Sequence, residues 1–247
     1  MPSVAVYSLK GGVGKTTIAV HLAWAAAALS ARRSLLWDLD AQAASTFLLG
    51  GAGSAGEDAQ AVFARDVSPS RLIRPTAIAG LDLLPADASL RTLDRFFFTL
   101  GKKRRLEKLL ERVGRDYERV LLDCPPGLAE TSEQVLAAAD LIIVPVIPSP
   151  LSQRALDEVV AYLDRQAARR GAILPVYNMV DRRRSMHLAA LEANPNWPVI
   201  PMASAIEALS GRSEGVGGLP QRSPAAVAIA TLWEGIERRL ARIGKGS

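Results

Sequence analysis

The chain has 247 residues, of which 49% are hydrophobic and 22% are charged, so it can bury a sizeable core and dominant disorder is excluded. Its one cysteine, Cys124, cannot form an internal disulfide, and two histidines are too few to build a cysteine and histidine metal cluster. The net charge is +5, and residues 150–247 hold 13 Lys and Arg against 9 Asp and Glu, so we expect an anionic partner at the C-terminal part.

The sequence also bears on the cellular setting. The longest uncharged stretch, residues 16–31, is shorter than the roughly 20 apolar residues of a membrane-spanning helix. Nothing before Val4 has the composition of a signal peptide. We therefore expect a soluble, cytoplasmic protein.

In chain order, the apolar pattern predicts a strand over Ser3–Leu9, a glycine loop and a helix over Thr17–Ala31. Further strands are expected at Ser34–Asp38, Leu81–Leu84, Val120–Asp123, Leu141–Val146, Ile173–Asn178 and Pro198–Ile200. Helical patterns such as 102–113 and 152–170 separate most of them. Strands that are apolar on both faces and alternate with helices predict a doubly wound α/β fold, with a mostly parallel sheet and helices on both faces.

Two glycine-rich stretches, Gly50–Gly56 and Gly211–Gly218, are expected to be mobile loops. Neither is long enough to separate two domains. No segment precedes the first strand that has room for a helix-turn-helix. We therefore expect a single domain over residues 1–247, without an N-terminal helix-turn-helix domain.

The glycine loop after the first predicted strand is the candidate phosphate-binding site. In residues 8–17, SLKGGVGKTT, the end of the phosphate-loop pattern G-x-x-x-x-G-K-[ST] is matched, whereas Leu9 occupies its first glycine position. Backbone N–H groups and the helix N-terminus favour a phosphate at this loop. The residues expected to hold the nucleotide phosphates are Gly11, Gly12, Val13, Gly14, Lys15, Thr16 and Thr17. Lys15 is suited to the β- and γ-phosphates, and the Thr16 hydroxyl to Mg²⁺.

Residues 10–17 resemble the deviant phosphate loop of the ParA/MinD family of ATPases. Further matches to this family lie along about the whole chain, at Asp38–Gln42 (DLDAQ), Leu83–Ala86 (LLPA), Tyr117–Pro126 (YERVLLDCPP) and Leu141–Leu156. The resemblance is strongest to the small ParA-like partitioning proteins. It implies one P-loop ATPase domain that uses ATP and Mg²⁺.

The resemblance also implies roles for single residues. Lys10 is similar to the signature lysine that reaches the nucleotide of the other subunit, and such a cation in trans accelerates phosphoryl transfer by roughly 10³ to 10⁵ in related systems. Asp40 resembles the aspartate that orients the attacking water. The metal site is implied to consist of Asp38, the Walker B aspartate Asp123 and Thr16. Ala41 stands where the family usually has proline.

Base and DNA contacts are implied in the same way. Asn178 resembles the residue that hydrogen-bonds adenine, and Pro201 and Met202 lie in the segment that covers the base. The basic residues expected to contact DNA are Arg182, Arg183, Arg184, Arg212 and Arg222.

The function that follows from this resemblance is a ParA-like ATPase. Its ATP-bound homodimer binds DNA without sequence preference, is nucleoid-associated, and hydrolyses ATP weakly until a ParB-like or other partner activates it. A MinD-like ATPase that associates with membrane is an alternative, because Ile229, Leu232, Ile236, Leu240 and Ile243 recur at helical spacing; a core-facing helix is the favoured interpretation. A nucleotide switch for an envelope or cellulose-synthesis machine is the third possibility.

Overall fold

A computed structural model describes residues 1–50, 58–64, 67–100, 104–165, 171–203 and 223–244. The strands are β1 Ser3–Val6, β2 Ser34–Asp38, β3 Arg74–Pro75, β4 Leu81–Leu84, β5 Arg119–Asp123, β6 Leu141–Val146, β7 Ala172–Val180 and β8 Val199–Pro201. The helices are α1 Lys15–Ala28, α2 Ala44–Leu48, α3 Ala61–Ala64, α4 Pro69–Leu72, the 3₁₀ helix η1 Ala88–Thr92, α5 Leu93–Leu100, α6 Arg105–Val113, α7 Glu130–Ala138, α8 Pro150–Arg165, α9 Ser185–Ala193 and α11 Pro224–Ile243.

The eight strands form one sheet in the order β3-β4-β2-β5-β1-β6-β7-β8. All neighbouring pairs are parallel except β3 with β4, which is antiparallel. The predicted doubly wound, mostly parallel sheet is therefore confirmed. Because β1 lies in the middle of the sheet, the loop that follows it opens between the ends of β5 and β6.

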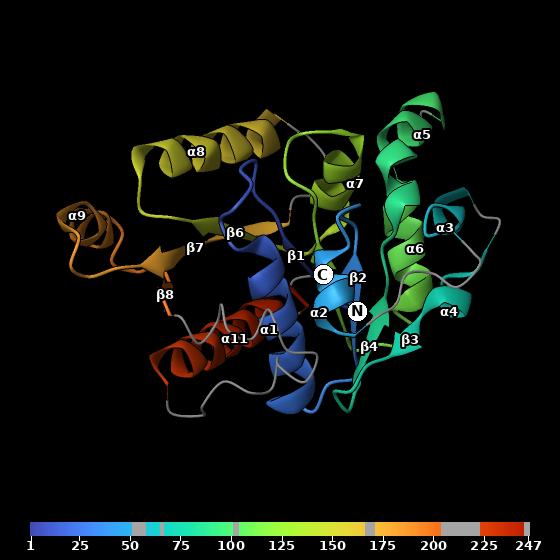
Figure 1. Cartoon of the computed structure of the whole chain (residues 1–247), viewed down its shortest axis with the longest axis horizontal. Helices are drawn as coiled ribbons and strands as arrows, with labels where there is room; N and C mark the ends of the chain where they lie inside the picture. The colour runs from blue at the N-terminus through green and yellow to red at the C-terminus, as the bar shows by residue number, and fades with distance from the viewer. Residues whose placement is uncertain (51–57, 65–66, 101–103, 166–170, 204–222, 245–247) are drawn as a thin grey trace.

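Strand side chains alternate between two apolar layers. On β1, Val4 and Val6 belong to the layer formed with α1 and α11, whereas Ala5 and the following Tyr7 belong to the layer formed with α6, α7 and α8. Figure 1 shows these two sets of helices on opposite sides of the sheet. Both faces of the central strands are thus covered, which is why all six residues of β6 are buried.

The first helix differs by a few residues from its predicted bounds. It begins at Lys15, because Gly14 caps it with a positive φ of 86°, and it ends at Ala28, shortly before Ala31 turns the chain with a φ of 49°. The predicted strand over Ser3–Leu9 is shorter for a related reason, since the chain leaves the sheet at Val6 to form the glycine loop. The other strand bounds agree within two residues.

The last helix, α11, settles the interpretation of the C-terminal apolar stripe. Ile229, Leu232, Ile236 and Leu240 are buried in the layer shared with α1, so the core-facing interpretation is confirmed. Arg119 at the start of β5 forms a bidentate ion pair with Glu237 on α11, in which Nε and Nη2 donate to the two carboxylate oxygens at 2.7 and 2.8 Å. In the portion of the chain that the structure describes, no helix is both long and apolar enough to cross a membrane.

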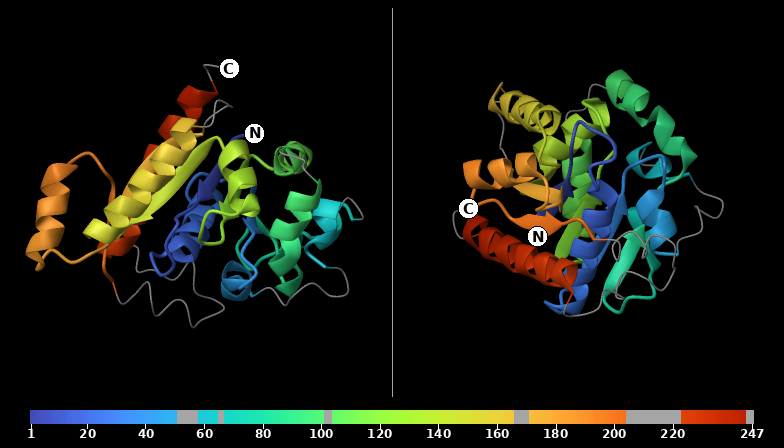
Figure 2. Two further views of the ribbon diagram at one scale, coloured as in Figure 1. Left: turned by 90° about the horizontal axis from the view of Figure 1, so that it is seen from above. Right: turned by 60° about the vertical axis from the view of Figure 1, so that its left-hand side comes forward.

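The sheet ends at β8, beyond β7. Helix α9 stands out beside β8, away from the remaining helices (Figures 1 and 2). The predicted loop over Gly211–Gly218, and all of Gly50–Gly56 except its first residue, lie outside the described residues.

Candidate functional site

The glycine loop joins the carboxyl end of β1 to the start of α1. Gly12 and Gly14 have φ values of 72° and 86°, which favour glycine. At Gly14 there is also no room for a side chain, since a Cβ would lie 2.4 Å from Nδ2 of Asn178. The predicted loop residues therefore lie together, with their backbone wrapped around the N-terminus of α1 as phosphate binding requires.

Lys15 points back into this loop. Its side chain is buried, and Nζ donates a hydrogen bond to the main-chain oxygen of Lys10 at 3.2 Å. Burial lowers the pKa of Lys15, while the nearby carboxylates of Asp123 and Asp40 act in the opposite direction. A buried cation held by a single carbonyl is well placed to exchange that carbonyl for an anion. Lys10 itself is half-buried.

Asp38 ends β2 and is fully buried. One carboxylate oxygen accepts hydrogen bonds from the main-chain N–H and the hydroxyl of Thr46, at 2.9 and 2.8 Å, and the other accepts from the N–H of Asp40 at 3.1 Å. Burial, followed by the charge of neighbouring Asp123, raises the pKa of Asp38 to about 7. This carboxylate thus ties α2 to the end of β2.

Asp123 lies opposite Asp38 in the register of β5 and β2. Its Oδ2 accepts a hydrogen bond from the Ser45 hydroxyl, whereas its Oδ1 is buried with no hydrogen-bond partner among the described residues. Burial raises the pKa of Asp123 to about 6, although Ser45, Thr16 and Lys15 lower it. A buried carboxylate oxygen without a partner fits a divalent cation, which would satisfy it.

No group of three or more His, Cys, Asp or Glu side chains in the described ranges is arranged to hold a metal ion. A site with so few protein ligands is compatible with Mg²⁺, because Mg²⁺ is usually held by one or two carboxylates together with water and substrate phosphates. Of the predicted ligands, Thr16 lies close enough to Asp123 for its hydroxyl to lower the pKa of that carboxyl.

Asp40 follows β2 at the same edge of the sheet. It is half-buried, and its Oδ1 accepts a hydrogen bond from the N–H of Gln42 at 2.9 Å. Asp40, Asp38, Asp123 and Lys15 are therefore brought together from three segments of the chain, as the sequence predicts.

Sequence reasoning missed the two residues of α2 that hold the aspartates. Ser45 contacts Asp123, and Thr46 contacts Asp38 and also accepts a hydrogen bond from the N–H of Ala86 at 2.9 Å. The signal available in the sequence was a Ser-Thr pair soon after Asp40, which resembles an ordinary helix start.

The predicted base-binding residues line one small cavity of about 70 Å³ beside the phosphate loop. Asn178 donates a hydrogen bond from Nδ2 to the main-chain oxygen of Val13 at 2.8 Å. One of its two amide N–H groups is therefore engaged with the loop, and the second N–H and Oδ1 are left for a ligand. Pro201 and Met202 form part of the opposite wall.

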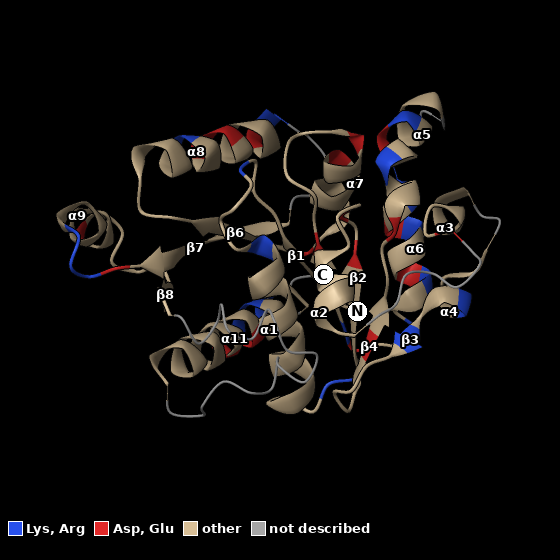
Figure 3. Ribbon diagram, in the orientation of Figure 1, with Lys and Arg blue, Asp and Glu red and all other residues tan. Residues whose placement is uncertain are grey.

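The predicted basic residues are only partly described. Arg182, Arg183 and Arg184 are exposed and lie between β7 and α9, at the margin of the molecule (Figure 3). Arg183 pairs with Asp181 at 2.9 Å, which partly neutralises it. Arg212 and Arg222 lie outside the described residues.

Arg182 also lines a groove of about 700 Å³ between the β8 edge and α11. Arg238 and Arg239, which line the same groove from α11, were noted in the sequence only as basic residues near the C-terminal apolar stripe and were not predicted to contact DNA. Their place in the groove follows from the way α11 packs beside β8, which the local sequence does not reveal.

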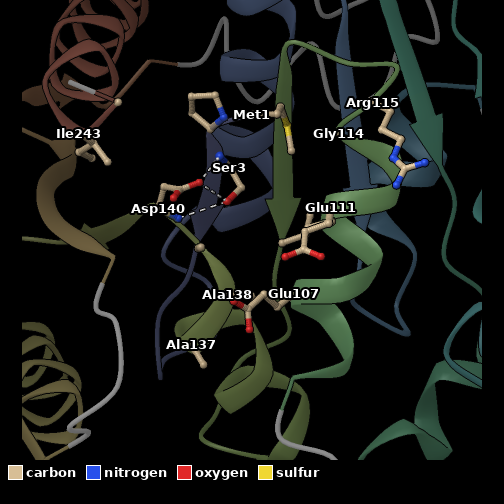
Figure 4. A pocket seen from close by; sticks show the side chains of 14 residues that line it. Met1, Ser3, Glu107, Glu111, Gly114, Arg115, Ala137, Ala138, Asp140 and Ile243 are labelled. Carbon is tan, nitrogen blue, oxygen red and sulfur yellow. Dashed lines mark hydrogen bonds between the residues drawn. The ribbon is translucent and has the colours of Figure 1, made fainter. Parts of the chain in front are cut away.

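A further cavity lies at the opposite edge of the sheet, where β1 and β6 begin (Figure 4). Ser3 and Asp140 close one side of it with hydrogen bonds of 2.9 Å from the Ser3 N–H and hydroxyl to the Asp140 carboxylate. Glu107 and Glu111 line another side. This cavity is remote from the phosphate loop and shares no residue with it.

A central parallel strand that leads through a glycine loop and Lys-Thr into a helix, beside a buried aspartate on the next strand, defines a P-loop nucleoside triphosphatase fold. A family model described as an AAA domain matches residues 1–173. A "ParA family protein" of Chlamydia trachomatis is 32% identical over 173 residues, covering 68% of each chain. The chromosome partitioning protein ParA of Caulobacter vibrioides is 32% identical over 194 residues, covering 74% of this chain and 71% of the relative. The chain belongs to the ParA family of P-loop ATPases.

Solved structures share the fold. Apo McdA of Cyanothece superposes with a TM-score of 0.83 at 22% identity, covering 97% of this chain and 99% of McdA. The septum site-determining protein MinD of Pyrococcus horikoshii, complexed with Mg-ADP, superposes with a TM-score of 0.77 at 22% identity, covering 98% of both chains.

Proposed function

We propose that this protein is a ParA-like ATPase whose ATP-bound homodimer binds DNA without sequence preference and so partitions DNA or positions a cargo. The observation that carries the proposal is the convergence of Lys15, Asp123 and the glycine loop at one edge of the sheet. The partitioning role is supported by the named function of the Caulobacter relative.

The first step is the binding of ATP with Mg²⁺, a proposal supported by the Mg-ADP complex of the related fold. Lys15 gives up its hydrogen bond to the Lys10 carbonyl and pairs with the β- and γ-phosphates. Thr16 and the unpartnered oxygen of Asp123 would hold the metal ion, with Asp38 beside it. The metal ion supplies positive charge that offsets the charge of the transferred phosphoryl group.

The second step is dimerisation. Lys10 precedes the glycines on the open side of the loop and is half-buried in this structure, so its side chain can serve a second subunit. Exposed apolar side chains at the same edge support such a contact, namely Leu128 after β5 and Leu151 at the start of α8. Asp40 then orients the attacking water.

Slow hydrolysis that a ParB-like or other partner stimulates fits the contacts of Asp40. Its carboxylate is engaged with the N–H of Gln42, and its main-chain oxygen accepts from the N–H of Ala43 at 2.8 Å. These bonds fix the position of the Asp40 carboxylate and leave its Oδ2 available to a water molecule, so slow hydrolysis fits a carboxylate that is not yet placed to align the attacking water. We propose that an activating partner acts on this segment.

The third step is DNA binding, which we assign to the groove between β8 and α11. Arg182, Arg238 and Arg239 line one concave surface, and the charge of Arg238 is partly neutralised by Glu234 at 3.7 Å. Contacts of Lys and Arg with phosphates supply most of non-specific DNA binding. The membrane-associated alternative requires the apolar face of α11 to contact lipid. Because that face is buried in the core, it supports this alternative less well.

Two substitutions separate ATP binding from dimerisation. Lys15→Ala removes the buried cation and should abolish ATP binding. Lys10→Ala should bind ATP but neither dimerise nor turn over. ATP affinity is measured by titration calorimetry and dimerisation by light scattering. Equal loss of ATP affinity in both variants, with an intact Lys10→Ala dimer, would refute the role of Lys10 in trans.

Asp40→Ala provides the complementary test. It removes the group that orients water but none that binds phosphate, so it should accumulate as an ATP-bound dimer with little turnover. Size-exclusion chromatography with ATP measures this state. A monomer that binds no ATP contradicts the assignment.

A further inference from the structure

His21 is a buried polar residue without an assigned role. It lies one turn beyond Thr17 on α1 and is only 3% exposed. Its Nδ1 lies 2.7 Å from the main-chain oxygen of Thr17. A carbonyl oxygen can only accept a hydrogen bond, so Nδ1 carries the proton and the neutral ring leaves Nε2 as a bare acceptor.

The Nε2 atom has no partner within the described structure. It is buried and makes no hydrogen bond to the described residues. Burial also lowers the pKa of His21, with the hydrogen bond to Thr17 opposing it, so the ring keeps its acceptor near neutral pH. A buried acceptor without a donor is costly, and native proteins usually supply one.

The place of His21 indicates where that donor comes from. His21 lines the 70 Å³ cavity together with Gly14, Thr17 and Asn178. The remaining walls are mostly apolar and include Ile18, Met179, Ile200, Met202 and Ile229. Apolar walls with a few convergent polar groups are typical of a site for a flat ring. Since Gly14 and Thr17 also form the end of the phosphate loop, a nucleotide bound there has its base on this side.

We propose that His21 determines the base specificity of the site, with Nε2 accepting a hydrogen bond from the exocyclic amine of adenine. A 6-oxopurine would instead direct an oxygen lone pair at the lone pair of Nε2. The site should therefore select 6-aminopurine nucleotides, because a site built around one hydrogen bond rejects an analogue that cannot make it. This inference rests on the proposed nucleotide binding at the loop.

The test compares ADP with inosine diphosphate, which carries oxygen in place of the amine. Titration calorimetry with Mg²⁺ should show that the wild-type protein binds ADP at least about tenfold more tightly, the size of one hydrogen bond. His21→Leu and His21→Met both remove the hydrogen-bond acceptor and replace the ring with side chains of different shape. In each variant the affinities for ADP and inosine diphosphate should become similar. Ile229→Val, on the same cavity, is the control and should keep the preference.

The outcomes separate this inference from the proposed function. If ADP, inosine diphosphate and inorganic triphosphate all fail to bind the wild-type protein, the nucleotide site itself is wrong. If both nucleotides bind and the His21 variants keep the wild-type preference, the role of His21 is wrong.

Nitrogen NMR of the wild-type imidazoles tests the inference without substitution. The chain has two histidines, and Nδ1 of the other, His187, accepts a hydrogen bond from the N–H of Asp181 at 3.0 Å. His187 is therefore the opposite tautomer, and the two rings are readily distinguished. The His21 Nε2 signal should shift with ADP and not with inosine diphosphate; an unchanged signal with ADP overturns the inference.

Discussion

Asn178 at the end region of β7 holds the phosphate loop in place through a hydrogen bond of 2.8 Å from its Nδ2 to the main-chain oxygen of Val13. The two residues are 165 positions apart, and both are buried. The same amide nitrogen lies 2.4 Å from the position that a Cβ on Gly14 would take, which is too close for a side chain there. The conformation of the loop thus depends on a strand two positions away in the sheet.

Asn178→Ala should weaken both folding and nucleotide binding. It leaves the buried Val13 oxygen without a donor, which costs about 1 to 3 kcal/mol of unfolding free energy, and it frees the loop that holds the phosphates. Asn194→Ala is the matched control, because it removes a 3.0 Å hydrogen bond to the Tyr177 hydroxyl away from the loop. Denaturant unfolding and ADP titration should show lower ADP affinity for Asn178→Ala alone. Equal ADP affinity in both variants would show that the bond does not shape the site.

Glycine substitutions should separate two positions in the loop. Gly14→Ala forces a side chain into a positive-φ residue and against Asn178, so we expect a loss of about 1 to 3 kcal/mol in unfolding free energy without nucleotide. Gly11→Ala meets no atom within 4 Å and should unfold like the wild type. Thermal and denaturant unfolding measure both. A Gly14→Ala protein as stable as Gly11→Ala contradicts the loop geometry.

The buried aspartates predict an unusual pH dependence. Folding raises the pKa of Asp38 and Asp123 from 3.8 to about 7 and about 6, chiefly through burial. Proton binding therefore favours the folded state, so their contribution is present below about pH 4 and is lost as the pH rises to about 7. For the coupled pair we expect a loss of several kcal/mol.

This contribution is measured by denaturant unfolding across pH 4 to 8 with a chelator present. The difference in unfolding free energy between the wild type and Asp38→Asn isolates the part of this contribution that depends on Asp38, because the amide does not titrate. That difference should change with pH in the metal-free protein, and saturating Mg-ADP should reduce the change. A difference that is independent of pH would contradict the burial of a titrating Asp38.

The groove between β8 and α11 should carry the DNA contacts. Charge reversal at Arg239 or Arg238 should weaken binding equally on all DNA sequences, and each lost phosphate contact should reduce the slope of log K against log salt concentration by about 0.9. Arg112→Glu, at an exposed position of α6, makes the same change of charge away from the groove and is the control. Fluorescence anisotropy at several salt concentrations measures both. An equal loss in Arg112→Glu would assign the effect to net charge alone.

The strands and the phosphate loop were predictable because their signals are local. Runs such as Ser34–Asp38 and Leu141–Val146 coincide with β2 and β6, since strands that are buried on both faces must be apolar throughout. The convergence of the strand-end aspartates was also predictable, because the carboxyl ends of parallel strands meet at one edge of the sheet.

The remainder depended on contacts between distant residues. Ser45 reaches Asp123 across 78 positions, and the neighbours of Asp123 give no sign of that bond. His21 lies in an Ala-rich helix whose pattern reports only burial, and its free nitrogen is evident only once the cavity is described. Helix α5 was not singled out in the sequence, although Leu93 and Phe97, four residues apart, give it a buried face.

The central claim is that ATP turns this protein into a dimer that binds DNA, and one measurement tests it most directly. Wild-type protein is incubated with non-specific duplex DNA or with anionic liposomes, each with and without ATP and Mg²⁺, and binding is measured by co-sedimentation. The proposed function predicts ATP-dependent binding to DNA of any sequence and no ATP-dependent binding to liposomes. ATP-dependent binding to liposomes without binding to DNA would contradict it and favour the membrane-associated alternative.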